Sequence, residues 1–252
     1  MKITTNTTVH LPATVEDIAL TIAANLEVTI IETSLHPSVV VEVGENSTVQ
    51  YLYLCSGDGD TKKVAYLHPH ATVQWRSAIL GGNNKVEIVT YHQDAGATSD
   101  HRGIFLGKGR DRFVLNYWSN HAAPHTTGHI LVHGVLFDSA YADFKGNIKI
   151  LQTGSDTNAS LVEETILLGE KSRSDSIPQL EIATNDVRAT HSSAISKIDD
   201  EQLFYLQSRG ISIEEGKRLI VRGFLEELIN EFGDDTTQQT IRDMIEERLK
   251  IL

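Results

Sequence analysis

Cysteine is almost absent from this 252-residue sequence, in which Cys55 is the single example. One thiol excludes an internal disulfide bond, and it excludes zinc modules that are built from several cysteines. This chain alone also cannot supply the four ligands, mostly thiolates, that a conventional iron–sulfur cluster takes. Any such cluster would need ligands from another chain. We expect Cys55 to have no role beyond core packing.

Long apolar runs are missing as well. No stretch approaches the roughly 20 residues that a membrane-spanning helix needs, and the Thr-rich start lacks the apolar core of a signal peptide. Basic residues are outnumbered, because 34 acidic residues against 22 basic ones give a net charge of −12. That charge argues against binding to nucleic acid or to an anionic membrane. Together with the lack of cysteine, these absences predict a soluble cytoplasmic protein.

What the sequence does contain, from residue 36 to about 190, is a succession of short strand-like segments. In one of them Val73, Trp75 and Ser77 alternate with polar residues, which is the period of a half-buried strand. The segment 14–26 stays open between helix and strand. Many short strands without helical crossovers predict a mainly β fold. A sandwich, a barrel and a β-solenoid all remain possible, since no crisp repeat selects among them.

The pattern changes near the C-terminus, where helices are expected. Asp199, Asp200 and Glu201 are acidic, as suits a helix N-terminus, and Gly210 can end the segment "EQLFYLQSRG" in a left-handed conformation. Ser212 stands three residues before Glu215, the spacing of a capping box, ahead of a second helix that Gly233 ends. Asp235 can cap a third helix.

Apolar residues in the last two predicted helices recur at intervals of three and four, so each helix should bury one face. They are, in the second helix, Leu219, Ile220, Phe224, Leu228 and Phe232, and in the third, Ile241, Met244, Ile245, Leu249 and Leu252. Each such side chain contributes roughly 1.5–3 kcal/mol when buried, so these helices should pack on the β region or on another protein. We therefore divide the chain into a β core, residues 1–198, and a C-terminal helical region, residues 199–252.

Four histidines at intervals of four are candidate metal ligands. They are His121, His125, His129 and His133. On one helix they would share a face and could bind zinc or nickel. However, Pro124 lies inside the run, and "GHILVHGVLF" has the character of a strand. A histidine-rich metal-binding β-protein is therefore an alternative, beside histidines that only occupy a turn and one face of a strand.

No enzyme motif is present. The sequence lacks a G-x-S-x-G nucleophile elbow, a cysteine nucleophile motif and a G-x-x-x-x-G-K-[ST] phosphate loop. We expect the chain not to be an enzyme and assign no catalytic residue. His191 lies where strand-like sequence gives way to helical sequence, and the residues alone leave it either structural or functional.

Three segments carry longer motifs. They are "HAAPHTTG" with "GVLFDSAYADFKGNIKI", then "EETILLGEKSRSDSIPQLEIATNDVRATHSSA", and finally "IDDEQLFYLQSRGISIEEGKRLIVRGFLEEL". The last contains a D-x-x-L-F-Y-L-x-S-R-G-I signature. These segments resemble the SufB/SufD family of iron–sulfur cluster assembly proteins, clearly over about half of the chain and more weakly back to about Glu32.

The resemblance implies a right-handed parallel β-helix with helical regions at its ends. It implies a SufD-like, non-enzymatic subunit of a SufBCD-type scaffold complex, paired with a SufB-type chain or with a second copy of itself. The helices after Ile198 would cap this end of the solenoid and bind a SufC-type ABC ATPase. Residues assigned to that contact are Arg209, Gly210, Leu219, Ile220, Gly223 and Phe224. Family members usually have an N-terminal helical region before the β-helix, whereas strands are expected here almost at once, as in a short form.

The resemblance also gives His191 a role near the interface of SufB and SufD. It would be a ligand of a nascent cluster or a group that exchanges a proton near neutral pH. SufB-type chains add a cysteine and a glutamate, and the matching positions here are close to Glu163 and at Ser192. Without those ligands we expect no cofactor bound stably by this chain alone, and at most a transient iron–sulfur cluster shared with a partner. An interaction scaffold without cluster chemistry is a further alternative.

Overall fold

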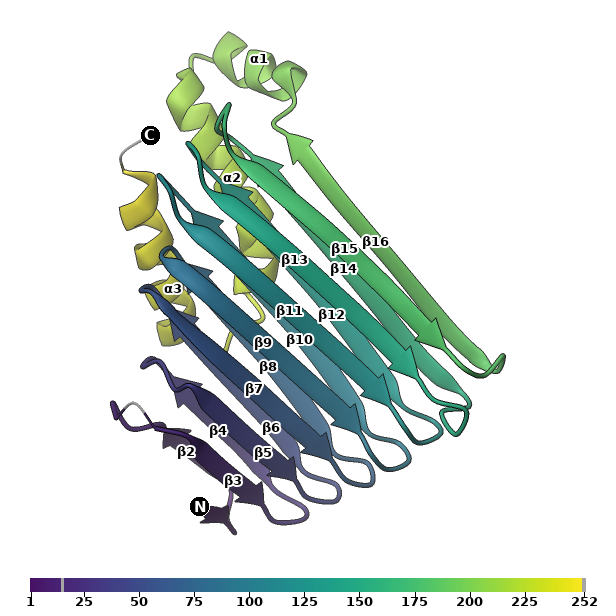
Figure 1. The fold of residues 1–252 in the computed structure, drawn as a ribbon. Helices are drawn as coiled ribbons and strands as arrows, with labels where there is room; N and C mark the ends of the chain where they lie inside the picture. Colours follow the sequence, from purple (N-terminus) through teal and green to yellow (C-terminus); the bar gives the residue numbers. More distant parts are fainter. Residues whose placement is uncertain (15, 251–252) are drawn as a thin grey trace.

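The computed structural model describes residues 1–14 and 16–250, and these residues form two parallel β-sheets and three helices (Figure 1). The strands of these ranges are β1 (Lys2–Ile3), β2 (Thr7–His10), β3 (Ile18–Ile22), β4 (Glu27–Glu32), β5 (Ser38–Val43), β6 (Thr48–Cys55), β7 (Gly59–Leu67), β8 (Thr72–Leu80), β9 (Asn83–His92), β10 (Thr98–Gly107), β11 (Arg112–His121), β12 (Thr127–Leu136), β13 (Tyr141–Ile150), β14 (Thr157–Leu167), β15 (Arg173–Ile182) and β16 (Val187–Lys197). The segment 14–26, left open from the sequence, contains strand β3.

Each strand pairs in parallel with the strand two positions along the chain. Odd-numbered strands form one sheet in the order β1 to β15, and even-numbered strands form the other in the order β2 to β16. The chain therefore winds as a solenoid, and the predicted parallel β-helix is confirmed. From Tyr51 to its neighbour Trp75 the chain runs 24 residues, whereas from Ile130 to its neighbour Leu161 it runs 31. Coils of unequal length explain why the sequence shows no crisp repeat.

Side chains alternate between the lumen of the solenoid and its outer surface, as the period of a strand requires. Val73, Trp75 and Ser77 all face inward and are buried, as their alternation predicts. Cys55 is also buried, and its Sγ lies 3.4 Å from Asn84 Oδ1. Packing of successive coils thus provides one continuous core along the solenoid.

Three helices follow the strands in the described part of the chain: α1 (Asp200–Ser208), α2 (Ile213–Ile229) and α3 (Asp235–Leu249). Gly210 has φ +84°, and Ser212 Oγ accepts a hydrogen bond from the Glu215 amide at 3.2 Å, so both predicted helix boundaries are confirmed. The third helix is capped by Asp234, whose carboxylate accepts from the Thr237 amide at 2.8 Å. The assignment of this cap to Asp235 was wrong by one residue.

The helices do not cap the end of the solenoid, and this expectation from the family resemblance was wrong. Instead α2 lies against β10 and β12, α3 lies against β8, and both run along the side of the solenoid (Figure 1). The reason is a second apolar core on the outer face of the even-numbered sheet. Its strand residues are Leu54, Ala78, Leu80, Ile104, Leu106, Val135 and Phe137. Helices that cover this outer stripe remove its apolar surface from water.

The buried face of α2 also differs from the predicted one. Leu228 and Phe232 are buried as expected, but Leu219 is 45% exposed. The helical residues that contact the sheet are Val221, Leu225, Leu228 and Ile229, with Phe224 packed at their edge. In α3 the predicted stripe is confirmed for Ile241, Ile245 and Leu249, with Met244 packed beside it. Leu252 lies outside the described residues.

Candidate functional site

The last coil of the solenoid is open. Strands β15 and β16 are the edge strands of the two sheets, and no described helix or strand covers them. Three isoleucines of these strands are exposed: Ile177 (45%), Ile182 (43%) and Ile195 (41%). An end with exposed isoleucines and two unpaired strand edges is a surface that another chain can extend.

His191 lies on this open end and faces the lumen. In the parallel register it continues an inward-facing row formed by side chains from five successive coils: Tyr51, Trp75, His101, Ile130 and Leu161. Every earlier member of the row is covered by the next coil, whereas His191 is exposed because β16 has no further neighbour. A histidine in the mouth of the lumen can therefore meet a ligand that a second chain brings to this end.

Glu163 lies one coil below and also faces the lumen. Its carboxylate is fully buried and accepts hydrogen bonds from the hydroxyls of Thr165 and Ser193, the latter at 2.8 Å. The register puts Ser193, not Ser192, beside Glu163, and Ser192 faces the opposite side of the sheet. The structure thus brings His191 and Glu163 to one face and leaves Ser192 away from them.

Two serines of β15 also face the lumen at the open end, and the sequence did not predict them as site residues. The Oγ atoms of Ser174 and Ser176 are buried without a hydrogen-bond partner in the described residues. In the register they continue the inward positions of Ala142 and Phe144. In the sequence these sites are marked only by a change from apolar residues to serine at inward positions. That change can be recognised only when the strand register is known.

The four regularly spaced histidines are not brought together. His129 and His133 lie on the same face of β12, but four residues of strand separate them by about 13 Å. His125 is in an exposed turn, where its Nδ1 lies 2.8 Å from Asp156 Oδ2. His121 faces the lumen from β11, stacked on His92 with ring centroids 4.0 Å apart.

Each of these imidazoles already has partners inside the fold. Nε2 of His121 lies 2.9 Å from Ser119 Oγ, and its Nδ1 lies 2.8 Å from Thr126 Oγ1. Burial lowers the pKa of His121 to about 2. His129 Nδ1 lies 2.7 Å from Ser160 Oγ. In residues 1–14 and 16–250, no three histidine, cysteine or carboxylate side chains are grouped closely enough to hold a metal ion.

A charged cluster is buried nearer the N-terminal end of the lumen. Glu32 accepts from Lys63 Nζ at 2.6 Å, from His36 Nδ1 at 3.0 Å and from the Tyr51 hydroxyl at 2.5 Å. Lys63 also donates to Thr61 at 2.7 Å. Burial lowers the pKa of Lys63, and the Glu32 carboxylate opposes this shift. Because both charged groups are bonded from several sides, we assign this cluster a structural role.

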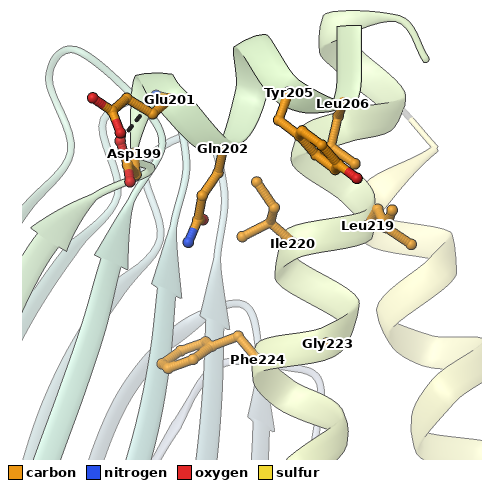
Figure 2. A pocket seen from close by; sticks show the side chains of 9 residues that line it. All are labelled: Asp199, Glu201, Gln202, Tyr205, Leu206, Leu219, Ile220, Gly223 and Phe224. Carbon is orange, nitrogen blue, oxygen red and sulfur yellow. Dashed lines mark hydrogen bonds between the residues drawn. The ribbon is translucent and has the colours of Figure 1, made fainter. Parts of the chain in front are cut away.

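A groove lies between α1 and α2, with a volume of about 530 Å³ (Figure 2). Four of the residues assigned to the ATPase contact line it: Leu219, Ile220, Gly223 and Phe224. Arg209 and Gly210, the other two assigned residues, do not line the groove. The Arg209 guanidinium lies 5.3 Å from the centre of the Tyr205 ring, and Gly210 lies in the turn between α1 and α2. Figure 2 shows Phe224 extending from α2 toward the strands, below Ile220.

The groove is apolar in its centre and acidic at one rim. Asp199 and Glu201 from the start of α1 form that rim. Phe204 and Tyr205 of α1 are 72% and 57% exposed, so apolar surface continues beyond the groove. Large exposed aromatic side chains next to a groove are typical of a protein-binding surface.

Comparison with known proteins identifies the family. The family model "SUF system FeS cluster assembly, SufBD core domain" matches residues 8–224. The chain belongs to the SufBD family. The resemblance noted from the sequence is therefore confirmed, and the matched range of this SufBD protein includes the open end and every residue that lines the groove.

Curated relatives of the SufBD chain are longer than it is. The iron–sulfur cluster assembly protein SufD of Bacillus subtilis is 32% identical over 179 residues, which cover 71% of this chain and 41% of that protein. SufD of Escherichia coli is 32% identical over 132 residues, covering 52% and 31%. A SufBD family protein of Mycobacterium leprae is 30% identical over 196 residues, covering 74% and 50%. The chain spans about a third to a half of the length of these relatives.

Among its described helices, none has the combination of length and apolar character that a membrane crossing requires.

Proposed function

We propose that this chain is a SufD-like, non-enzymatic subunit of an iron–sulfur cluster assembly complex. It binds a SufC-type ABC ATPase through the groove between α1 and α2, and it pairs at its open end with a SufB-type chain or with a second copy of itself. The observation that carries this proposal is the presence of two uncovered surfaces on a SufBD-family fold, an apolar groove and an end with unpaired strand edges. One surface is available for each partner.

The groove supports the ATPase contact. It gathers Leu219, Ile220 and Phe224 along α2, and of these three only Phe224 also packs against the residues that hold this helix on the sheet. Its acidic rim favours a partner segment with an apolar face flanked by basic residues. Work done by ATP hydrolysis would take place in the partner and reach this chain through α2.

The open end supports pairing. A chain that adds strands to β15 and β16 satisfies their free backbone groups and covers the exposed isoleucines. His191 then lies at the junction, on the same inward face as the buried Glu163, with two serine hydroxyls that still lack partners in the described residues. A nascent cluster held there is the cargo of the complex, shared between chains, because Cys55 is buried and lies four coils away from β14.

Light scattering on a size-exclusion column tests the ATPase contact, using the chain mixed with a SufC-type ATPase from the same source. We expect one co-eluting complex that Phe224→Glu or Leu219→Glu disrupts. Thr236→Glu, a charge at an exposed site on α3, is the matched control and should leave the complex intact. Two separate peaks with the unaltered chain would refute the ATPase contact.

Cluster formation tests the role of His191. In the assembled complex we expect His191→Ala to slow the appearance of cluster absorbance, whereas His129→Ala, which alters an outward-facing histidine, should not. If His191→Ala leaves cluster formation unchanged while the complex still assembles, the chain is an interaction scaffold without cluster chemistry. The buried state of its one thiol is the observation that keeps this second candidate in view.

A further inference from the structure

His133 connects strand β12 to α2, the helix that forms one wall of the groove. The side chain faces outward from the sheet, yet it is only 2% exposed because α2 covers it. Its ring stacks on the ring of Phe224, with centroids 4.2 Å apart and planes within 10°. Its Nδ1 lies 2.9 Å from the Phe224 carbonyl oxygen. His133 therefore contacts both the side chain and the backbone of one groove residue.

The hydrogen bond fixes the orientation of the imidazole. A carbonyl oxygen can only accept, so Nδ1 carries a hydrogen and donates it. The carbonyl has two lone pairs and can accept this bond in addition to the amide of its own helix. On the other side of the ring, Nε2 lies 3.6 Å from Glu164 Oε2, on the neighbouring strand at the same register. The ring is thus held between β14 and α2.

An apolar residue would fill this space with less desolvation. Adjacent outward positions of β12 are Leu131 and Val135, and both pack in the apolar core under the helices. Burying an imidazole there costs free energy unless its polar atoms are bonded. The bond to Phe224 offsets that cost, and it ties the position of Phe224 to the sheet rather than to helix packing alone.

We propose that His133 is a positioning residue of the docking groove. It holds Phe224 at the edge of the groove in the free protein, so that a partner meets a wall that is already in place. A preformed wall raises affinity because less side-chain freedom is lost on binding. The inference rests on the proposed role of the groove in binding the ATPase, and it goes further by naming a residue that does not itself line the groove.

Two substitutions separate positioning from simple packing. His133→Leu fills the apolar site but cannot donate to the Phe224 carbonyl. His133→Asn is smaller and more polar, but its side-chain amide can reproduce the Nδ1 donor. A purely structural role predicts that His133→Leu is at least as stable as the natural chain and binds as well, whereas His133→Asn is weaker in both respects.

The positioning role predicts the opposite order for binding. By calorimetric titration with the SufC-type ATPase we expect His133→Leu to lose about tenfold in affinity while its Tm is retained. His133→Asn should recover most of the affinity in spite of a lower Tm. His129→Leu is the matched control, because His129 lies on the same face of β12 and bonds Ser160 instead of α2. Affinities that follow the order of Tm values would overturn the inference.

A second measurement reads the position of Phe224 without any partner. The chain contains seven phenylalanines, so ¹⁹F NMR of the 4-fluorophenylalanine-labelled protein is tractable, with Phe224→Leu to assign the resonance. We expect His133→Leu to shift and broaden that resonance, and His133→Asn to restore its narrow line. An unchanged Phe224 resonance in His133→Leu would overturn the inference, whereas failure of the natural chain to bind the ATPase would instead overturn the proposed function.

Discussion

Gly223 offers the sharpest test of the groove, because it can be enlarged without disturbing the fold. It lies in the middle of α2, and a Cβ built at this position meets no atom within 4 Å apart from its chain neighbours and the backbone of its own helix. The backbone there is ordinary helix, so the cost of glycine is the conformational freedom that it loses on folding. Gly223→Ala should therefore stabilise the free chain by about 0.5–1 kcal/mol.

A larger side chain at the same position points into the groove. Gly223→Trp finds open space in the free protein, so we expect its Tm to stay within a few degrees of the natural value. In the complex the indole would occupy volume that the partner needs. Removing the central contacts of an interface typically costs about 2 kcal/mol or more, and 1.4 kcal/mol corresponds to tenfold in Kd. The Trp variant should bind the ATPase more than tenfold more weakly.

The assay combines thermal unfolding with calorimetric titration for both variants. Gly223→Ala should be more stable and bind within a factor of a few of the natural affinity, since it adds one methyl group. Natural affinity in Gly223→Trp would refute the reasoning that the partner enters the groove at this point. A marked loss of stability in Gly223→Ala would show that the space beside this residue is filled in solution.

Buried histidines and the buried lysine make the folded state sensitive to pH and to substitution. Burial lowers the pKa of His92 to about 4, of His101 to about 3 and of His121 to about 2, whereas the unfolded chain takes up these protons below about pH 6.5. Stability should therefore fall as pH drops, by about 2 kcal/mol per histidine at pH 5; urea unfolding at pH 5, 6 and 7 measures it, and a flat profile would contradict the burial of these rings. Lys63→Met should cost about 3–5 kcal/mol because it leaves Glu32 as an uncompensated buried charge, and the same urea titration at pH 7 would contradict this if the midpoint did not move.

The strands were predictable because alternation is a local property, but the solenoid was not. Val73, Trp75 and Ser77 show the period of two in the letters, whereas the row through Trp75 along the solenoid is built from residues that follow one another at separations of 24 to 31 positions. No local rule sets the length of the loop between two coils. The family resemblance supplied the architecture, and periodicity alone left three β folds open.

The site was less predictable than the fold, for a related reason. Histidines four apart suggested a cluster, but on a strand the same spacing places His129 and His133 far apart. His129 is hydrogen-bonded to Ser160 on the next strand, whereas His133 is covered by α2. Ser192 was chosen by position in the sequence, and the register gave the contact to Ser193 instead. The location of α2 and α3 depended on apolar residues at outward positions of the even strands, such as Ile104.

The open last coil has a consequence for how the molecule is made. Parallel strands stacked in register, with free backbone groups on the last one, form the same kind of template that lets a fibril grow. Once β16 has paired with β14, any chain with a matching strand edge can add to β16. Such a chain can be another copy of this protein that is still folding. Under the proposed function, pairing with a SufB-type chain would compete with self-association at this edge. Expression of this chain alone should therefore yield dimers or larger assemblies that are joined through this end.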